Sequence, residues 1–225
     1  MDGIFEDRRD AGRRLGAALA ARGYGGEGLL VLGIPRGGLV VAAEVARALE
    51  APLDVVIARK IRAPYQPELA IGAVVSGDAM PIVNPDLARA TGATPEYLDG
   101  EIRHQREEIE RRLALYRGDR PPPSLAGRVV VVVDDGIATG YTFRAALEGL
   151  RRQGVERLVA AVPVAPPESL GILARLAEDV VCLATPEPFL AVGVWYRNFE
   201  QSTDEEVIAL LRENRERAPS RAVQA

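Results

Sequence analysis

The sequence predicts an α/β protein in which a parallel, twisted sheet is covered by helices on both faces. Short apolar runs alternate along the 225 residues with segments whose apolar residues recur at helical spacing. Continuous apolar strands separated by helices are typical of parallel sheets that are buried on both faces. One strand ends in two aspartates and another in a glycine-rich turn, at the positions where open α/β sheets bind their ligands.

Five apolar runs are the candidate strands of the main sheet. They are rich in Val, Leu, Ile and Ala, and they lie at 29–33, 53–58, 128–133, 157–164 and 179–185. Two shorter strands are expected at 69–76 and 81–83, with antiparallel pairing as an alternative. The remaining periodic segments predict helices at 7–22, 39–50, 94–118, 142–154, 167–177 and 203–217.

The helix expected at 94–118 is the most clearly delimited one. Thr94 is a capping residue and Pro95 occupies the first turn, and both are helix-start signals. Its apolar residues form one stripe between charged residues: Leu98, Ile102, Ile109, Leu113 and Tyr116. We expect this stripe to pack on the core. A seam between two copies of the chain is the alternative, so a homodimer stays open.

Composition excludes several classes of function. The net charge of −4 and the pI near 5.3 argue against nucleic-acid binding, which needs a basic face. No apolar run reaches the roughly 18 residues of a membrane span, and the charged N-terminus lacks the apolar stretch of a signal peptide. We therefore expect a cytoplasmic protein without a membrane partner. With one histidine, His104, and one cysteine, Cys182, a zinc site or a Ser-His-Asp mechanism is not expected.

The segment VVVVVDDGIATGYT (129–142) carries the strongest chemical signal. Asp134 and Asp135 follow a strand of five valines, where two adjacent carboxylates would repel one another without a ligand. A ligand with hydroxyl groups, or a divalent cation, relieves that repulsion. The turn that follows leads into a helix, so its N–H groups can surround a phosphate, with Thr139 and Thr142 as further donors. An acid pair beside an anion-binding turn suits a sugar phosphate.

This segment resembles the signature of the type I phosphoribosyltransferases, whose substrate is 5-phosphoribosyl 1-diphosphate (PRPP). That signature is four apolar residues, two acidic residues, a short variable stretch and Thr-Gly-x-Thr or Ser, and residues 130–142 match it at every defining position. The resemblance implies that Asp134 and Asp135 hold the ribose hydroxyls. It implies that the 5′-phosphate is held by the following turn: Gly136, Ile137, Ala138, Thr139, Gly140, Tyr141 and Thr142.

The resemblance extends to a second motif, GIPRGG (33–38), at the end of the first strand. In similar proteins this is the loop that binds pyrophosphate, and a basic residue ending the next strand also contacts PRPP. It therefore implies pyrophosphate contacts from Pro35, Arg36, Gly37, Gly38, Arg59 and Lys60, and a water-excluding mobile loop at 61–74. Lys60 is the only lysine in the chain, although it could be a chance survivor. Candidate catalytic residues are Asp134, Asp135, Lys60 and Arg36.

The resemblance also implies an overall layout. The sheet would have strand order 3-2-1-4-5, and a small hood would cover the site. One domain would span 1–225, with a core at about 28–61 and 119–185, an inserted loop and helix at 62–118, and a hood with a final helix at 186–217. The end of this stretch looks like a bacterial group of uncharacterised predicted phosphoribosyltransferases. Its aromatics Phe189, Trp195 and Tyr196 either stack on the acceptor or pack into a cluster.

We expect transfer of the phosphoribosyl group from PRPP to a nitrogen nucleophile, such as a nucleobase, with release of pyrophosphate. Mg²⁺ is the expected cofactor, held by Asp134 and Asp135 largely through the substrate. Ala138 stands where the 6-oxopurine enzymes carry an acidic residue, so the pattern is closer to adenine-type or amidophosphoribosyl-type sites. A non-catalytic PRPP-sensing or partner-binding protein is one alternative, and a hydrolase acting on a sugar phosphate is another.

Overall fold

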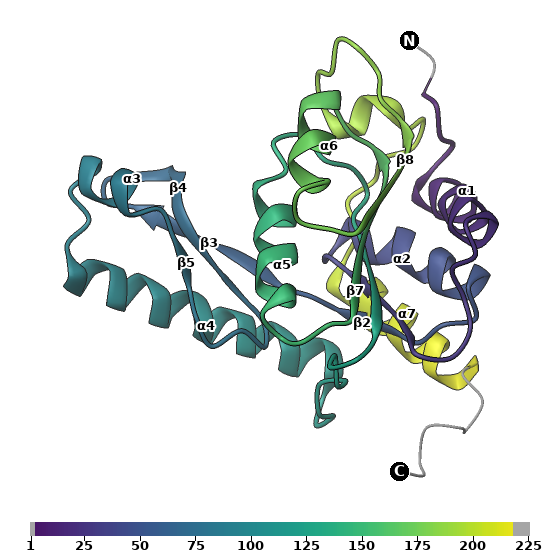
Figure 1. The fold of residues 1–225 in the computed structure, drawn as a ribbon, viewed down its shortest axis with the longest axis horizontal. Coiled ribbons are helices and arrows are strands. Elements are labelled where there is room, and N and C mark those ends of the chain that lie inside the picture. Colours follow the sequence, from purple (N-terminus) through teal and green to yellow (C-terminus); the bar gives the residue numbers. More distant parts are fainter. Residues whose placement is uncertain (1–2, 218–225) are drawn as a thin grey trace.

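The computed structural model describes residues 3–217 and contains two separate sheets (Figure 1). The main sheet is parallel and has the order β2-β1-β6-β7-β8. Its strands are β1 (Leu29–Gly33), β2 (Leu53–Val55), β6 (Val129–Val133), β7 (Arg157–Val164) and β8 (Asp179–Ala184). The smaller sheet is antiparallel, with the order β3-β4-β5, and consists of β3 (Ala58–Ala63), β4 (Gln66–Val75) and β5 (Ile82–Val83). The predicted α/β class is confirmed.

Side chains of the central strands alternate between two hydrophobic clusters, which explains why these strands are apolar throughout. Leu29 and Val31 of β1 belong to one cluster, and Leu30 and Leu32 belong to the other. Helices α1 (Arg8–Ala21), α2 (Gly37–Ala48) and α7 (Asp204–Arg217) cover the first face. Helices α5 (Tyr141–Arg151) and α6 (Pro167–Leu173) cover the second face (Figure 1). Both faces of the sheet are therefore buried.

The strand order corrects one expectation. Numbered along the chain, the five strands run 2-1-3-4-5 rather than 3-2-1-4-5, because β2 is the edge strand in the part of the chain that the structure describes. After Val56, whose N–H still donates to the carbonyl of Gly33, the chain leaves the main sheet and pairs in the antiparallel one. The order still reverses between β1 and β6, and this switch point is where open α/β sheets bind ligands.

The smaller sheet and two helices form an arm, residues 58–117, that projects from the core (Figure 1). Residues 61–74, expected as a mobile loop, instead lie in the hairpin of β3 and β4 and pair across it, as Ile61 does with Gly72. Helix α3 (Pro85–Ala90) is capped by the side chain of Asn84, and helix α4 (Pro95–Arg117) by that of Thr94. Apolar residues of β4 pack in both clusters: Ile71 and Val74 belong to the first, and Ala73 and Val75 belong to the second.

Helix α4 connects the arm to the core as its apolar stripe predicts. Ile109 and Tyr116 are buried in the first hydrophobic cluster, and Leu98, Ile102 and Leu113 pack against that cluster. The expected docking of this stripe on the core is confirmed. His104 lies exposed on the opposite side of the helix, which confirms its interpretation as part of a solvated face.

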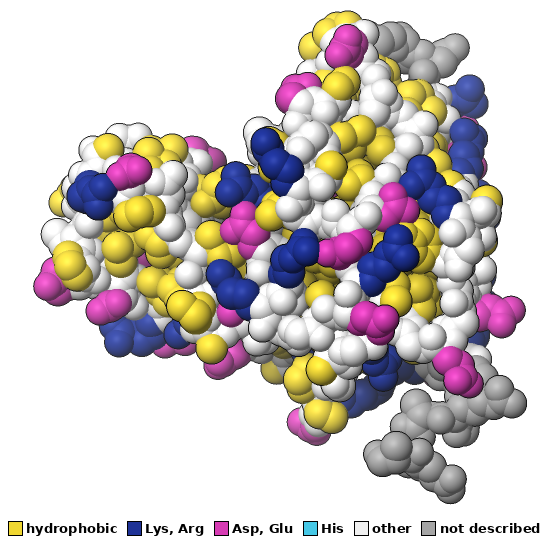
Figure 2. Space-filling view, in the orientation of Figure 1, with side chains coloured by type: hydrophobic (Ala, Val, Ile, Leu, Met, Phe, Trp, Pro, Cys, Tyr) yellow, Lys and Arg dark blue, Asp and Glu magenta, His cyan; other side chains and the backbone are white. Residues whose placement is uncertain are grey.

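The surface carries charges of both signs. Figure 2 shows Lys and Arg side chains interspersed with Asp and Glu over the face that it presents. Within residues 3–217, no helix combines the length and the apolar character that a membrane span requires.

Candidate functional site

The two sequence motifs meet at the switch point. Asp134 and Asp135 follow β6, and Gly37 and Gly38 begin α2 after the adjacent strand β1. A Cβ atom on Gly38 would lie 2.6 Å from Oδ1 of Asp134, and one on Gly37 would collide with the carboxylate of Asp135. The glycines of one motif therefore lie directly against the carboxylates of the other, and only residues without a side chain allow this approach.

The acid pair is electrostatically strained. Burial, together with the charge of Asp135, raises the pKa of Asp134 well above its ordinary value. The backbone N–H of Asp135 donates to Oδ1 of Asp134 at 2.9 Å, which favours the ionised form but does not outweigh the other effects. A ligand that donates hydrogen bonds to these carboxylates would relieve the strain.

Asp135 is held from two sides by residues distant in the sequence. Nε of Arg8 donates to its Oδ2 at 2.7 Å, and both side chains are largely buried, with exposures of 11% and 16%. The hydroxyl of Tyr196 donates to its backbone carbonyl. Burial raises the pKa of that phenol, and the nearby charge of Asp135 adds to the effect. Tyr196 therefore stays protonated and acts as a donor.

The turn after the acid pair presents unpaired backbone donors. Gly140 has a φ of 69° at the N-terminus of α5, a backbone conformation that favours glycine. Within residues 3–217, the backbone N–H groups of residues 138–142 make no hydrogen bond. Ala138 and Thr139 are exposed, so these donors are accessible to solvent. Unpaired amides at a helix N-terminus favour phosphate binding.

The turn is also fixed from behind. The N–H of Ile137 donates to the carbonyl of Val164 at 2.9 Å, and Oγ of Ser169 donates to the carbonyl of Ala138 at 3.1 Å. Ile137 is buried, with its side chain in the second cluster. Of the predicted turn residues, Tyr141 and Thr142 are half-buried in the first turn of α5. The turn is therefore anchored to β7 and α6, while the N–H groups of residues 138–142 keep no partner among the described residues.

The loop Pro35–Gly38 places Arg36 at the N-terminus of α2. The peptide bond between Pro35 and Arg36 is cis. Arg36 is half-buried, and within residues 3–217 its guanidinium forms no ion pair or hydrogen bond. Burial and a hydrogen bond to Asp204 raise the pKa of Tyr116 to about 12, while Arg112 and Arg36 act in the opposite direction. Both guanidinium groups are therefore close to the same phenol.

Arg59 and Lys60 require a correction. They were expected to end the second buried strand, but β2 ends at Val55 and both residues lie inside β3. Lys60 is exposed there and lies opposite Ala73 of β4. Arg59 is half-buried and its Nε donates to Oε1 of Gln105 at 2.9 Å. Burial, followed by the charge of Arg112, lowers the pKa of Arg59, while the charges of Glu108 and Glu101 act in the opposite direction.

Arg112 thus acts electrostatically on both Arg59 and Tyr116, and Arg36 acts on the same phenol. In the part of the chain that the structure describes, none of these three arginines has a carboxylate within ion-pair distance. Another arginine of α4 does form an ion pair: Arg117 lies 2.9 Å from Asp54. Guanidinium groups without an ion-pair partner are available to a diphosphate. Arg112 was not singled out from the sequence, because nothing in its charged surroundings distinguishes it from the other arginines of α4.

The aromatic residues of the hood, here residues 186–203, are mostly packed. Trp195 and Tyr196 have exposures of 6% and 5% and belong to a small cluster with Phe5 and Val164. Phe189 is half-buried, with its ring centroid 6.1 Å from that of Trp195. This packing favours the packed-cluster alternative for Trp195 and Tyr196. The role of the three residues in an acceptor pocket stays a prediction.

Magnesium fits the acid pair only as a partner of the substrate. Within residues 3–217, no group of three or more His, Cys, Asp or Glu side chains could hold a metal ion. Asp134 and Asp135 alone offer adjacent carboxylates at the site, and Mg²⁺ is commonly bound through one or two carboxylates together with substrate phosphates. The donor set is therefore compatible with Mg²⁺ that arrives with a diphosphate.

Comparisons with known proteins indicate one family. The model of the family described as phosphoribosyl transferase domain matches residues 6–181. The chain is 46% identical over 223 residues to the Mycobacterium tuberculosis protein named "Putative phosphoribosyl transferase Rv0571c", covering 99% of this chain and 50% of that protein. It thus spans about half the length of the curated relatives that it matches. A "Uracil phosphoribosyltransferase" of Streptomyces avermitilis is 40% identical over 67 residues, 29% of this chain and 32% of that protein.

A solved structure extends the likeness to the whole fold. The crystal structure of TT1426 from Thermus thermophilus superposes with a TM-score of 0.81 and 47% sequence identity, covering 93% of this chain and 98% of that one. The family match covers both the loop at 33–38 and the acid pair with its turn. The resemblance predicted from residues 130–142 is therefore confirmed, and the chain belongs to the phosphoribosyl transferase domain family.

Proposed function

We propose that this chain transfers the 5-phosphoribosyl group of PRPP to a nitrogen nucleophile of the nucleobase class and releases pyrophosphate. The family membership supports phosphoribosyl transfer. The observation that carries the proposal is the close approach of Gly37 to Asp135 and of Gly38 to Asp134. It joins an acid pair, an anion-binding turn and a basic loop at the carboxyl ends of two neighbouring strands. PRPP carries a group that suits each of these parts: ribose hydroxyls, a 5′-phosphate and a diphosphate.

Each group of residues has a distinct task in this proposal. The carboxylates of Asp134 and Asp135 accept hydrogen bonds from the ribose hydroxyls. The N–H groups of residues 138–142 hold the 5′-phosphate, with Thr139 as an additional donor. Arg36, Arg59 and Arg112 hold the pyrophosphate. With both ends of the substrate fixed, the acceptor nitrogen is positioned next to C1.

The reaction is a displacement at C1 of the ribose. The bond between C1 and the pyrophosphate oxygen breaks, and a bond between C1 and the acceptor nitrogen forms through a state with oxocarbenium character. Fixed guanidinium groups stabilise the charge that develops on the pyrophosphate. Mg²⁺, when bound with the substrate, would neutralise further negative charge on the diphosphate. The remaining tasks are positioning of the reactants and exclusion of water.

The test measures pyrophosphate release from PRPP and Mg²⁺ with adenine, guanine, hypoxanthine, xanthine, uracil and orotate. We expect pyrophosphate release that depends on the presence of one of these bases. Asp135→Asn should reduce the rate of release at least tenfold, about 1.4 kcal/mol. Asp86→Asn is the matched control, because this carboxylate is 85% exposed on α3 and, among residues 3–217, pairs with Arg89 alone. PRPP binding without release for any base would contradict the transfer and indicate a sensor. Release that needs no base would indicate a hydrolase.

A further inference from the structure

Arg8 joins three parts of the molecule through one guanidinium group. It lies in the first turn of α1, and its Nε donates to Oδ2 of Asp135 at 2.7 Å. Its Nη1 donates to the backbone carbonyl of Glu200 at 2.6 Å. Its Cζ atom lies 3.8 Å from the centroid of the Phe199 ring, a distance typical of a cation–π contact. The acid pair, the hood and the N-terminal helix thus share a single side chain.

Backbone hydrogen bonds reinforce the same connection. The N–H of Phe5 donates to the carbonyl of Trp195 at 3.0 Å, and the N–H of Arg197 donates back to the carbonyl of Phe5 at 2.9 Å. The N–H of Asn198 donates to the carbonyl of Glu6, also at 2.9 Å. The segment that leads into α1 is therefore bound along the hood immediately before Arg8 reaches Asp135.

We propose that Arg8 is a positioning residue for phosphoribosyl transfer, which fixes Asp135 for the ribose hydroxyls and ties the hood to that carboxylate. This inference rests on the function proposed above. Arg8 acts through Asp135 and through the hood, so it is assigned no contact with the reacting atoms.

The geometry leaves room for the substrate on Asp135. Arg8 uses Oδ2 only, and within residues 3–217 the other carboxylate oxygen, Oδ1, makes no hydrogen bond. A Cβ atom on Gly37 would lie 2.7 Å from Nε of Arg8 and would also collide with Oδ2 of Asp135. The absence of a side chain at Gly37 therefore permits the ion pair, while Oδ1 stays available to a ribose hydroxyl. Removal of Arg8 would weaken binding rather than relieve a block.

The same contacts couple the hood to the ribose subsite. Tyr196 donates to the main chain of Asp135, while Phe199 and Glu200 bind the arginine that holds its side chain. The rings of Tyr196 and Phe199 also contact each other, with centroids 5.1 Å apart. A hood that moved away from the site would have to break all of these contacts. We therefore expect the loss of Arg8 to affect turnover as well as affinity.

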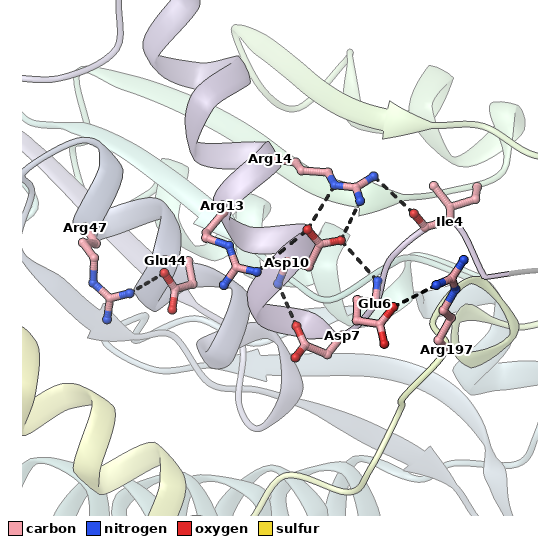
Figure 3. A network of polar contacts seen from close by, with 9 residues as sticks. All are labelled: Ile4, Glu6, Asp7, Asp10, Arg13, Arg14, Glu44, Arg47 and Arg197. Carbon is pink, nitrogen blue, oxygen red and sulfur yellow. Dashed lines mark hydrogen bonds and ion pairs between the residues drawn. The ribbon is translucent and has the colours of Figure 1, made fainter.

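Arg14 provides a matched control on the same helix. It forms an ion pair with Asp10 at 2.8 Å, donates to the backbone carbonyl of Ile4 at 3.2 Å, and lies 5.6 Å from the centroid of the Phe5 ring. Figure 3 shows Arg14 with Asp10 and Ile4, within a network that contains neither Asp134 nor Asp135. Arg14→Gln thus removes the same three kinds of contact without touching the acid pair.

The experiment measures the Kd of PRPP by calorimetry with Mg²⁺, and the kcat of pyrophosphate release, for Arg8→Gln, Arg8→Lys and Arg14→Gln. We expect Arg8→Gln to raise the Kd and lower kcat, each at least tenfold. Arg8→Lys should keep the Kd within about threefold of the wild type but still lose about tenfold in kcat, because an ammonium group cannot bond Asp135 and Glu200 together while lying flat on Phe199. Arg14→Gln should stay within about twofold in both.

Equal values for Arg8→Gln and Arg14→Gln, with both proteins folded by circular dichroism, would overturn the proposal. Should Arg8→Gln fail to fold, Phe199→Leu takes its place: it removes the stacking partner, and kcat should fall while the Kd is unchanged. The role of Arg8 would equally be contradicted if Phe199→Leu and Arg8→Lys both kept the kcat of the wild-type protein. Wild-type protein that binds no PRPP would instead overturn the proposed function itself.

Discussion

Gly38 lies so close to Asp134 that a Cβ atom on the glycine would stand 2.6 Å from Oδ1 and 2.8 Å from Cα of the aspartate. The second of these atoms belongs to the backbone, so rotation of a side chain cannot relieve the collision. The first turn of α2 and the end of β6 are thereby held in one arrangement. This contact holds the glycine motif against the acid pair. Four predictions concern residues at or near this contact.

Gly38→Ala should separate the two motifs. Because the methyl group meets backbone atoms, we expect the end of β6 to shift and PRPP affinity to fall at least tenfold, about 1.4 kcal/mol. The control is Gly100→Ala on α4, where a Cβ atom would have no neighbour within 4 Å. That change should leave PRPP affinity intact and slightly stabilise the helix. Calorimetry on both variants measures the effect, and equal affinities would show that the two motifs are not coupled.

Asp134→Asn should stabilise the protein at neutral pH. The folded-state pKa of Asp134 is raised by burial and by the charge of Asp135, so stability from this group is full at low pH and is lost as pH rises through the raised pKa. The amide cannot ionise, and it retains the oxygen that accepts from the N–H of Asp135. We expect Tm at pH 7–8 to rise by about 2–4 °C, the shift that about 1 kcal/mol produces in a domain of this size.

The pH dependence is the control for this prediction. The difference in Tm between Asp134→Asn and the wild type should shrink as the pH falls below the raised pKa, because the wild-type carboxyl is then also uncharged. PRPP affinity should drop although stability increases, as is common where a site is strained for function. A variant less stable than the wild type across the whole pH range would contradict the strain inferred for the acid pair.

Thr139→Val should weaken binding of the 5′-phosphate selectively. Thr139 is exposed, and within residues 3–217 its hydroxyl makes no hydrogen bond, so the change should not affect Tm. We expect the Kd of PRPP and of ribose 5-phosphate to rise at least about tenfold, because about one hydrogen bond to a charged group is lost. The Kd of pyrophosphate should be unchanged. A uniform loss for all three ligands would place Thr139 outside the phosphate subsite.

Arg36→Gln should have the complementary effect. Its guanidinium is half-buried at the start of α2 and has no carboxylate partner among the described residues. Since charge-assisted contacts to phosphate are strong, we expect the Kd of pyrophosphate and of PRPP to rise at least tenfold, and that of ribose 5-phosphate to stay within about twofold. Calorimetry with the three ligands thus separates the two subsites. Identical ligand profiles for Arg36→Gln and Thr139→Val would refute the assignment.

The core of the fold could be predicted because its signals are local. Uninterrupted apolar strands such as 129–133 require burial on both faces, and the stripe through Ile109 and Tyr116 requires a partner surface. The strand order was wrong because pairing is not local. Residues 58–63 could extend the main sheet or pair back on 66–75, and the antiparallel alternative prevails in the hairpin. The same change of sheet displaced Arg59 and Lys60 from the expected strand end.

The site divides in the same way between local and distant contributions. Asp134, Asp135 and the turn to Thr142 are contiguous, so a strand, an acid pair and a helix start could be recognised together. Arg8 is separated from Asp135 by 127 residues and belongs to a charged N-terminal segment with several arginines. Arg112 is likewise one of many charged residues on α4. Their roles depend on which helix packs beside which loop, and neither composition nor periodicity specifies that.

The central claim is that the carboxylates of Asp134 and Asp135 and the amides of residues 138–142 bind one phosphorylated ribose. A crystal structure of the protein with PRPP and Mg²⁺ tests it most directly. The account predicts ribose hydroxyls at hydrogen-bond distance, about 2.6–3.0 Å, from these carboxylates, and the 5′-phosphate on the amides beside Thr139. Carboxylates turned toward the core, with no anion at the turn, would contradict it.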